Sequence, residues 1–89
     1  MTPEYVSTEQ SVREYVTKNV HADTSKITSK TLLFKEGIFD SMAFVLIIDF
    51  LEETFYIKIS DEDLVEENFE SIEAITKFIF RKKEVNVVQ

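Results

Sequence analysis

The chain has 89 residues, of which 44% are hydrophobic, and this is enough for one small domain with a single core but not for two. It contains no cysteine, which excludes disulfides, thiolate metal sites and a cysteine nucleophile. The formal net charge is −7, and residues 40–73 hold eleven acids against a single base, Lys58, so this part of the chain should repel nucleic acid and attract proteins with basic surfaces.

The sequence carries no signal for secretion or for membrane insertion. The amino terminus lacks the basic stretch and the apolar segment of a signal peptide. The longest apolar run, residues 42–48, is far shorter than the roughly 18 residues that a membrane span needs. With one glycine and one proline, the chain also lacks the turn residues of an all-β fold. We therefore expect a soluble, cytoplasmic, helical protein.

The first predicted helix ends near Val20 and has two candidate starts. Thr2 before Pro3 is typical of an N-cap followed by proline at the first helical position, whereas Ser7 opens a capping-box pattern that would start the helix at Thr8. An apolar stripe then follows at four-residue spacing, consisting of Val12, Val16 and Val20.

Residues 21–40 form a long connection that contains one apolar cluster, at residues 32–34. A loop of this length in so small a domain is usually functional or packed by its own side chains. We expect the cluster to attach the loop to the core just before Gly37 and so to fix where Ser41 is presented. His21, the only histidine, is expected to be solvated at the end of the first helix.

The second predicted helix, residues 41–56, follows directly on Asp40 and Ser41. Both residue types are favoured helix N-caps, because their side-chain oxygens accept hydrogen bonds from backbone N–H groups of the first turn. The Ser41 hydroxyl should therefore be exposed at a loop–helix junction, beside N–H groups and a helix dipole that favour a phosphate. This setting suits a serine that carries a phosphoryl-linked group.

This helix has two distinct faces. Its core stripe is Phe44, Ile47, Ile48, Leu51 and Phe55. The opposite face mixes large apolar residues with acids: Met42, Leu46, Asp49 and Glu53, with Phe50 at its margin. Apolar side chains surrounded by charge are typical of a surface that binds a partner protein. The alternative is that a short third helix covers part of this face.

The carboxyl-terminal third is predicted to contain a short element and a longer helix. Ser60 with Asp63 resembles a capping box that opens a segment ending near Asn68. Its acids lack the glycine and the spacing of a calcium-binding loop, so we expect a solvated acidic face and no metal site. Ser71 is expected to cap the last helix, whose core positions are Ile72, Ile75, Phe78 and Ile79.

The expected fold is therefore all-α: a small four-helix bundle of three main helices and one short helix, with a long loop between the first and the second. The domain spans residues 1–83, and residues 84–89 are predicted to be a flexible tail because they show no cap and no periodicity.

Asp40-Ser41-Met42, preceded by Gly37-Ile38-Phe39, resembles the D-S-L/M attachment motif of acyl and peptidyl carrier proteins. The likeness in order and spacing spans about residues 7–82. It implies that Ser41 carries 4′-phosphopantetheine, installed from coenzyme A by a phosphopantetheinyl transferase, with Asp40 as motif residue and helix cap. The protein would then not be an enzyme but a carrier, holding an acyl, aminoacyl or aryl group as a thioester on the thiol of that arm.

The resemblance also implies partners. Carriers of this family dock an adenylating or other acyl-loading enzyme, and then acyl-transfer or condensing enzymes with basic surfaces, in fatty acid, polyketide or nonribosomal peptide biosynthesis. Docking would fall on the second helix, at Met42, Leu46, Asp49, Phe50 and Glu53. Fatty-acid carriers tend to have acids where this chain has Ala43 and Leu46, so its docking face is more apolar and more similar to that of a stand-alone carrier of a specialised pathway. We expect the protein to be a monomer.

Two other functions are compatible with the same residues. Asp40, Ser41 and His21 could suggest a small serine hydrolase, but the chain lacks the G-x-S-x-G elbow, and an aspartate next to the serine is poorly placed to orient a base. The other alternative is a helical interaction module that binds a partner through the second helix without being modified.

Overall fold

Helices form all the regular structure in the described part of this computed structural model, which covers residues 2–19 and 24–88. The main helices are α1 (Pro3–Asn19), α2 (Ser41–Phe55) and α4 (Ile72–Val88), and α3 (Glu66–Phe69) is a single short helix. Two turns of 3₁₀-helix, η1 (Thr24–Lys26) and η2 (Asp61–Asp63), lie in the connections. The predicted all-α fold of three main helices and one short helix is confirmed.

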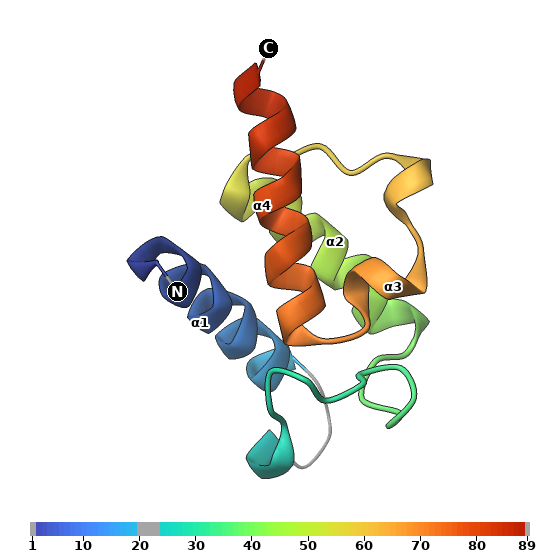
Figure 1. The fold of residues 1–89 in the computed structure, drawn as a ribbon. Coiled ribbons are helices and arrows are strands. Elements are labelled where there is room, and N and C mark those ends of the chain that lie inside the picture. The colour runs from blue at the N-terminus through green and yellow to red at the C-terminus, as the bar shows by residue number, and fades with distance from the viewer. Residues whose placement is uncertain (1, 20–23, 89) are drawn as a thin grey trace.

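The helices are arranged around α4, which runs through the middle of the view in Figure 1 with α1 on one side and α3 on the other, while α2 crosses behind it. Both α1 and α3 pack against α4, and α1 also packs against α2. Burial of apolar surface is the main stabilising term for such a small bundle. The buried apolar residues are Val12, Val16, Ile27, Leu33, Phe39, Ile47, Leu51, Ile57, Phe69, Ile72, Ile75, Phe78 and Ile79.

Local capping decides where α1 and α4 begin. The Thr2 hydroxyl accepts a hydrogen bond from the Tyr5 N–H at 3.1 Å, so the earlier of the two predicted starts is the one used. The Ser71 hydroxyl likewise accepts a hydrogen bond from the Ala74 N–H at 3.0 Å, which confirms the predicted cap of α4. Val20 and His21 lie outside the described residues.

The end of α4 differs from the prediction. The helix continues to Val88, whereas the sequence pattern suggested an end near Lys83. Neither a glycine nor a proline follows Ile72, so no residue of the kind that usually ends a helix is present there. The flexibility of residues 84–89 stays a prediction.

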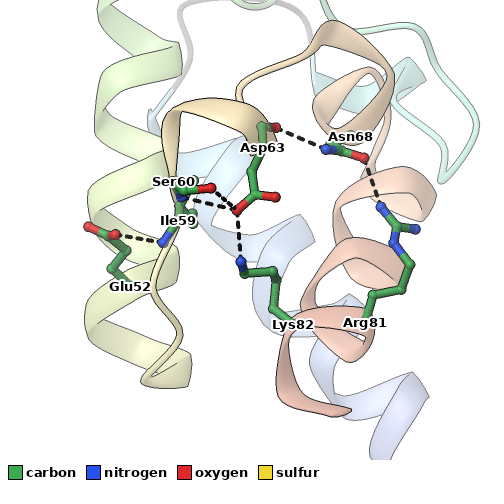
Figure 2. Close-up of polar contacts among 7 residues, drawn as sticks. All are labelled: Glu52, Ile59, Ser60, Asp63, Asn68, Arg81 and Lys82. Atoms are coloured by element: carbon green, nitrogen blue, oxygen red, sulfur yellow. Dashed lines mark hydrogen bonds and ion pairs between the residues drawn. The ribbon is translucent and has the colours of Figure 1, made fainter. Parts of the chain in front are cut away.

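The connection from α2 to α3 is held by a chain of polar contacts that Figure 2 shows. A Glu52 carboxylate oxygen on α2 accepts a hydrogen bond from the Ile59 N–H at 2.9 Å. The Asp63 carboxylate accepts hydrogen bonds from the N–H and the hydroxyl of Ser60, at 3.0 and 3.1 Å, as predicted for a capping box. The same carboxylate is 2.8 Å from the Lys82 ammonium on α4. Asp63 is therefore not one of the freely solvated acids that the sequence suggested.

A second contact ties α3 to α4 at the same place (Figure 2). The Asn68 side chain donates a hydrogen bond to the Asp63 carbonyl at 2.9 Å and accepts one from the Arg81 guanidinium at 2.7 Å. η2 and α3 are thus fixed to α4 by charged and polar side chains as well as by the core.

Replacement of Asp63 by asparagine is expected to destabilise the protein by about 1 kcal/mol at pH 7, because a partly exposed ion pair is lost. The hydrogen bond from Lys82 holds the pKa of Asp63 below its ordinary value of 3.8. A lowered carboxylate pKa stabilises the fold above the ordinary value, and this stabilisation is lost as the pH falls through the lowered pKa. The wild type should therefore lose its advantage over the variant below about pH 4. Urea unfolding of both proteins at pH 7 and pH 3 measures this, and an equal difference at both pH values would contradict it.

Candidate functional site

α2 begins where it does because Asp40 caps it. Asp40 has an extended backbone conformation, with φ −110° and ψ −175°, and its Oδ1 accepts a hydrogen bond from the Ala43 N–H at 2.8 Å. Its carbonyl accepts the first helical hydrogen bond, from the Phe44 N–H at 3.0 Å. The predicted capping role of Asp40 is confirmed, and Ser41 is the first helical residue rather than the cap.

The Ser41 side chain is exposed, as predicted. It stands at the positive end of a helix of 15 residues, where backbone N–H groups of the first turn are not used by the helix itself. A hydroxyl in this place can be reached by an enzyme, and a phosphate attached to it would meet a favourable field. The cap uses Oδ1 of the neighbouring Asp40 carboxylate.

The loop before Ser41 is anchored at Leu33, which is completely buried. The Leu33 N–H donates a hydrogen bond to the Glu70 carbonyl at 2.7 Å, and the Leu33 carbonyl accepts hydrogen bonds from the N–H groups of Ile38 and Phe39, at 2.8 and 2.9 Å. Gly37 closes the intervening turn with a φ of +75°, a conformation that glycine adopts without strain. The apolar cluster therefore attaches the loop to the core, as the sequence predicted.

The earlier part of the loop is held by polar contacts. The Arg13 guanidinium on α1 donates hydrogen bonds to the Ile27 carbonyl at 3.2 Å and to the Ser29 hydroxyl at 2.8 Å. The Ser29 carbonyl in turn accepts a hydrogen bond from the Glu73 N–H, in the first turn of α4, at 2.9 Å. The long loop is thus fastened to two helices before it reaches Ser41.

A continuous series of aromatic rings packs against Phe44 in the first turn of α2. Phe34 in the loop meets both Phe39 and Phe44 edge-on, with ring centroids 5.5 Å apart in each pair. Phe44 meets Phe69 of α3 at 5.2 Å, and Phe69 meets Phe78 of α4 at 5.1 Å. Such pairs each add about 0.5–1.5 kcal/mol beyond the area they bury. The loop, the start of α2, α3 and α4 are therefore linked through one packed cluster.

The outward face of α2 exposes large apolar side chains next to Ser41. Met42 is 69% exposed and Leu46 43% exposed, and Asp49 and Glu53 are exposed further along the helix. α3 does not cover these residues, so the predicted alternative is wrong for them. Val45, at 63% exposed, belongs to the same face and was missed, although its i+3 spacing from Met42 could have identified it.

Phe50 does not belong to that exposed face. It is half-buried, and its ring stacks on Tyr15 of α1 with the centroids 4.1 Å apart. The Tyr15 hydroxyl donates a hydrogen bond to the Leu46 carbonyl at 3.1 Å, and burial, with the nearby Asp49 carboxylate, raises the pKa of Tyr15. The prediction that Phe50 is exposed at the margin of the docking face is wrong, because α1 packs over this side of α2.

A depression lies beside Ser41, between the end of α1, the loop and the first turns of α2. It has a volume of about 230 Å³ and is lined by Asn19, Gly37, Ile38, Asp40, Met42, Ala43 and Leu46. Its walls combine apolar side chains with backbone and amide groups, so it can accommodate part of a mixed polar and apolar group attached at the adjacent hydroxyl.

No described helix has both the length and the apolar character that crossing a membrane requires. Within residues 2–19 and 24–88, no three or more histidine or acidic side chains are grouped so that they could hold a metal ion.

A family model described as a phosphopantetheine attachment site matches residues 10–79, which include the Asp40-Ser41 junction, the exposed face of α2 and the first turns of α4. No curated protein matches the chain.

Proposed function

This chain belongs to the phosphopantetheine-attachment-site family of acyl and peptidyl carrier proteins, whose cofactor is covalently attached 4′-phosphopantetheine, and we propose that Ser41 is its attachment residue. The observation that carries this proposal is the exposed Ser41 hydroxyl at the amino-terminal end of α2. An enzyme can reach it there, and the first-turn N–H groups favour a phosphodiester.

The surroundings of Ser41 fit the group. The Asp40 cap fixes the first turn of α2, and the Leu33 anchor and the aromatic cluster fix the loop that leads into it. The depression beside Ser41 offers apolar walls to an arm that starts at the hydroxyl. The attached group supplies a thiol that can hold a thioester, which this chain cannot do by itself because it has no cysteine. Ser41 acts as an anchor and takes no part in turnover.

The chain then holds the attached group and presents its cargo, and the partner enzymes carry out the chemistry. It accepts an acyl, aryl or aminoacyl group from an adenylating or other loading enzyme and delivers it to acyl-transfer or condensing enzymes. A tether raises the effective concentration of its cargo at a docked active site. Ala43 and Leu46 in place of acids make the docking face more apolar, which supports a stand-alone carrier of a specialised pathway. We propose that it acts as a monomer in the cytoplasm.

Partner enzymes would dock on the outward face of α2, which we define as Met42, Val45, Leu46, Asp49 and Glu53. The apolar members lie nearest Ser41 and the acids lie further along the helix. No ion pair of Asp49 or Glu53 occurs within the described residues, so both carboxylates are available to basic side chains of a partner.

Reversal of both charges, Asp49→Lys with Glu53→Lys, is expected to lower kcat/KM for modification by a phosphopantetheinyl transferase by about tenfold at low salt. The fold should be preserved because both side chains are exposed. The measurement is the initial rate of modification with coenzyme A, at 20 and at 300 mM salt. The control is the double variant Glu4→Lys plus Glu14→Lys, which reverses two exposed charges on α1. Equal rates for this variant and the control would show that Asp49 and Glu53 do not contribute to docking.

Intact mass spectrometry tests the proposed function directly. After incubation with coenzyme A and a broad-specificity phosphopantetheinyl transferase, the protein should gain the mass of one phosphopantetheinyl group, and peptide mapping should place it on Ser41. A folded protein that gains no mass would leave the unmodified interaction module as the better account of the exposed face.

A further inference from the structure

Tyr56, which caps the carboxyl-terminal end of α2, combines a strained backbone with an exposed side chain. Its N–H closes the helix by donating to the Glu52 carbonyl at 3.1 Å, and its backbone is left-handed, with φ 56° and ψ 42°. This conformation is unfavourable for residues with a bulky side chain, and helices that end this way usually have glycine at this position. Tyr56 is the only non-glycine residue with a positive φ in the described part of the chain.

The Tyr56 side chain makes no packing or hydrogen-bond contribution to the described part of the fold. It is 86% exposed, the largest exposed fraction among the exposed large apolar and aromatic side chains of the described residues. No ring contact and no side-chain hydrogen bond of Tyr56 is present within residues 2–19 and 24–88. An aromatic side chain that strains the backbone and packs on nothing in its own chain points to a contact with another molecule.

Tyr56 lies at the carboxyl-terminal end of the outward face of α2. It directly follows the last helical residue, Phe55, and comes three residues after Glu53 in the sequence. At 1.5 Å per residue it lies about 21 Å along the helix axis from Met42. The outward face of α2 therefore has apolar side chains near Ser41 and two acids further along, and the exposed Tyr56 ring lies where the helix ends.

We propose that the Tyr56 ring is a contact residue for the phosphopantetheinyl transferase that modifies Ser41, in addition to the outward face of α2. This proposal rests on the proposed function. That enzyme must sit over Ser41, and a standard interface of about 800 Å² per partner is about 30 Å across, which is enough to reach Tyr56 if the enzyme lies along α2. The partner surface then has basic side chains facing Asp49 and Glu53, and beyond them an apolar socket that receives the ring. Tyrosine is among the residues that most often dominate binding at such positions.

The test compares transferase kinetics of Tyr56→Gly and Tyr56→Phe, using the full chain, coenzyme A and a broad-specificity phosphopantetheinyl transferase. Tyr56→Gly should raise the KM for the carrier about tenfold, which is the change expected on loss of an aromatic anchor, and leave kcat within about twofold because Ser41 is untouched. Tyr56→Phe should stay within about threefold of wild type, because the ring is retained. Val6→Ala, which shortens an exposed apolar side chain on α1, is the matched control and should change neither constant.

The melting temperature of each variant shows whether a change in KM arises from weaker binding or from unfolding. Because glycine relieves the left-handed strain, the Tm of Tyr56→Gly should equal or exceed that of the wild type, so a higher KM cannot be ascribed to unfolding. An unchanged KM for Tyr56→Gly, or an equal loss in Tyr56→Phe, would overturn the anchor while modification of the wild type still upheld the proposed function. A wild type that gains no mass would overturn both.

Discussion

Ser41→Ala is expected to abolish modification completely while leaving the fold intact. The substitution removes the only atom to which the proposed phosphodiester can be attached at the start of α2. The structure also indicates a small structural cost, because the cap hydrogen bond is made by Asp40 and not by Ser41. An exposed serine at the first helical position should change the free energy of unfolding by no more than about 0.5 kcal/mol.

Intact mass after exposure to coenzyme A and transferase, together with a urea unfolding curve, measures both parts of this prediction. Ser7→Ala, which removes an exposed serine hydroxyl on α1, is the matched control and should be modified like the wild type. A mass gain on the alanine variant would mean that another hydroxyl carries the group. An unfolded variant would mean that Ser41 has a structural role that its exposure does not suggest.

Leu33→Ala is expected to have the largest effect on stability among the residues that position the site. Leu33 is fully buried, and truncation of a buried leucine costs about 2–5 kcal/mol through lost burial and the cavity left behind. A domain of this size has only about 5–15 kcal/mol to lose. Because the Leu33 backbone also binds Glu70, Ile38 and Phe39, loosening it should disturb the loop that leads to Ser41.

The free energy of unfolding is measured by urea titration, with far-UV circular dichroism as the probe. Transferase kinetics are measured at urea concentrations below the unfolding midpoint. The neighbouring Leu32 is 38% exposed, so Leu32→Ala is the control and should cost clearly less than Leu33→Ala. Equal costs for the two variants would show that the loop is not anchored through Leu33.

Much of the fold could be predicted from the sequence because helix capping and helix periodicity are local. The Ser71 cap and the buried apolar positions of α4 depend on residues within a few positions of one another, and these were predicted. The buried Thr76, whose hydroxyl donates to the Ile72 carbonyl, was not predicted. The end of α4 was missed because the pattern weakens there while nothing in the sequence stops the helix.

The candidate site divides in the same way. The exposure of Ser41 and the cap at Asp40 followed from the residues at one junction. Phe50 was misplaced because its burial depends on Tyr15, which lies on another helix and stacks on it. A helical wheel shows which residues share a face, but not which neighbouring helix covers that face.

The helical class, the junction that presents Ser41, the apolar anchor at residues 32–34 and the acidic, partly apolar character of α2 could all be predicted from the sequence, since each depends on neighbouring residues or on composition. The partners with which these segments pack could be found only in the folded molecule. The ring series from Phe34 through Phe69 to Phe78, and the pairing of Asp63 with Lys82 nineteen residues later, join segments that are far apart in the chain. Such contacts exist only after the helices have packed together, because the shape of the shared core, and not the local sequence, sets which distant side chains meet.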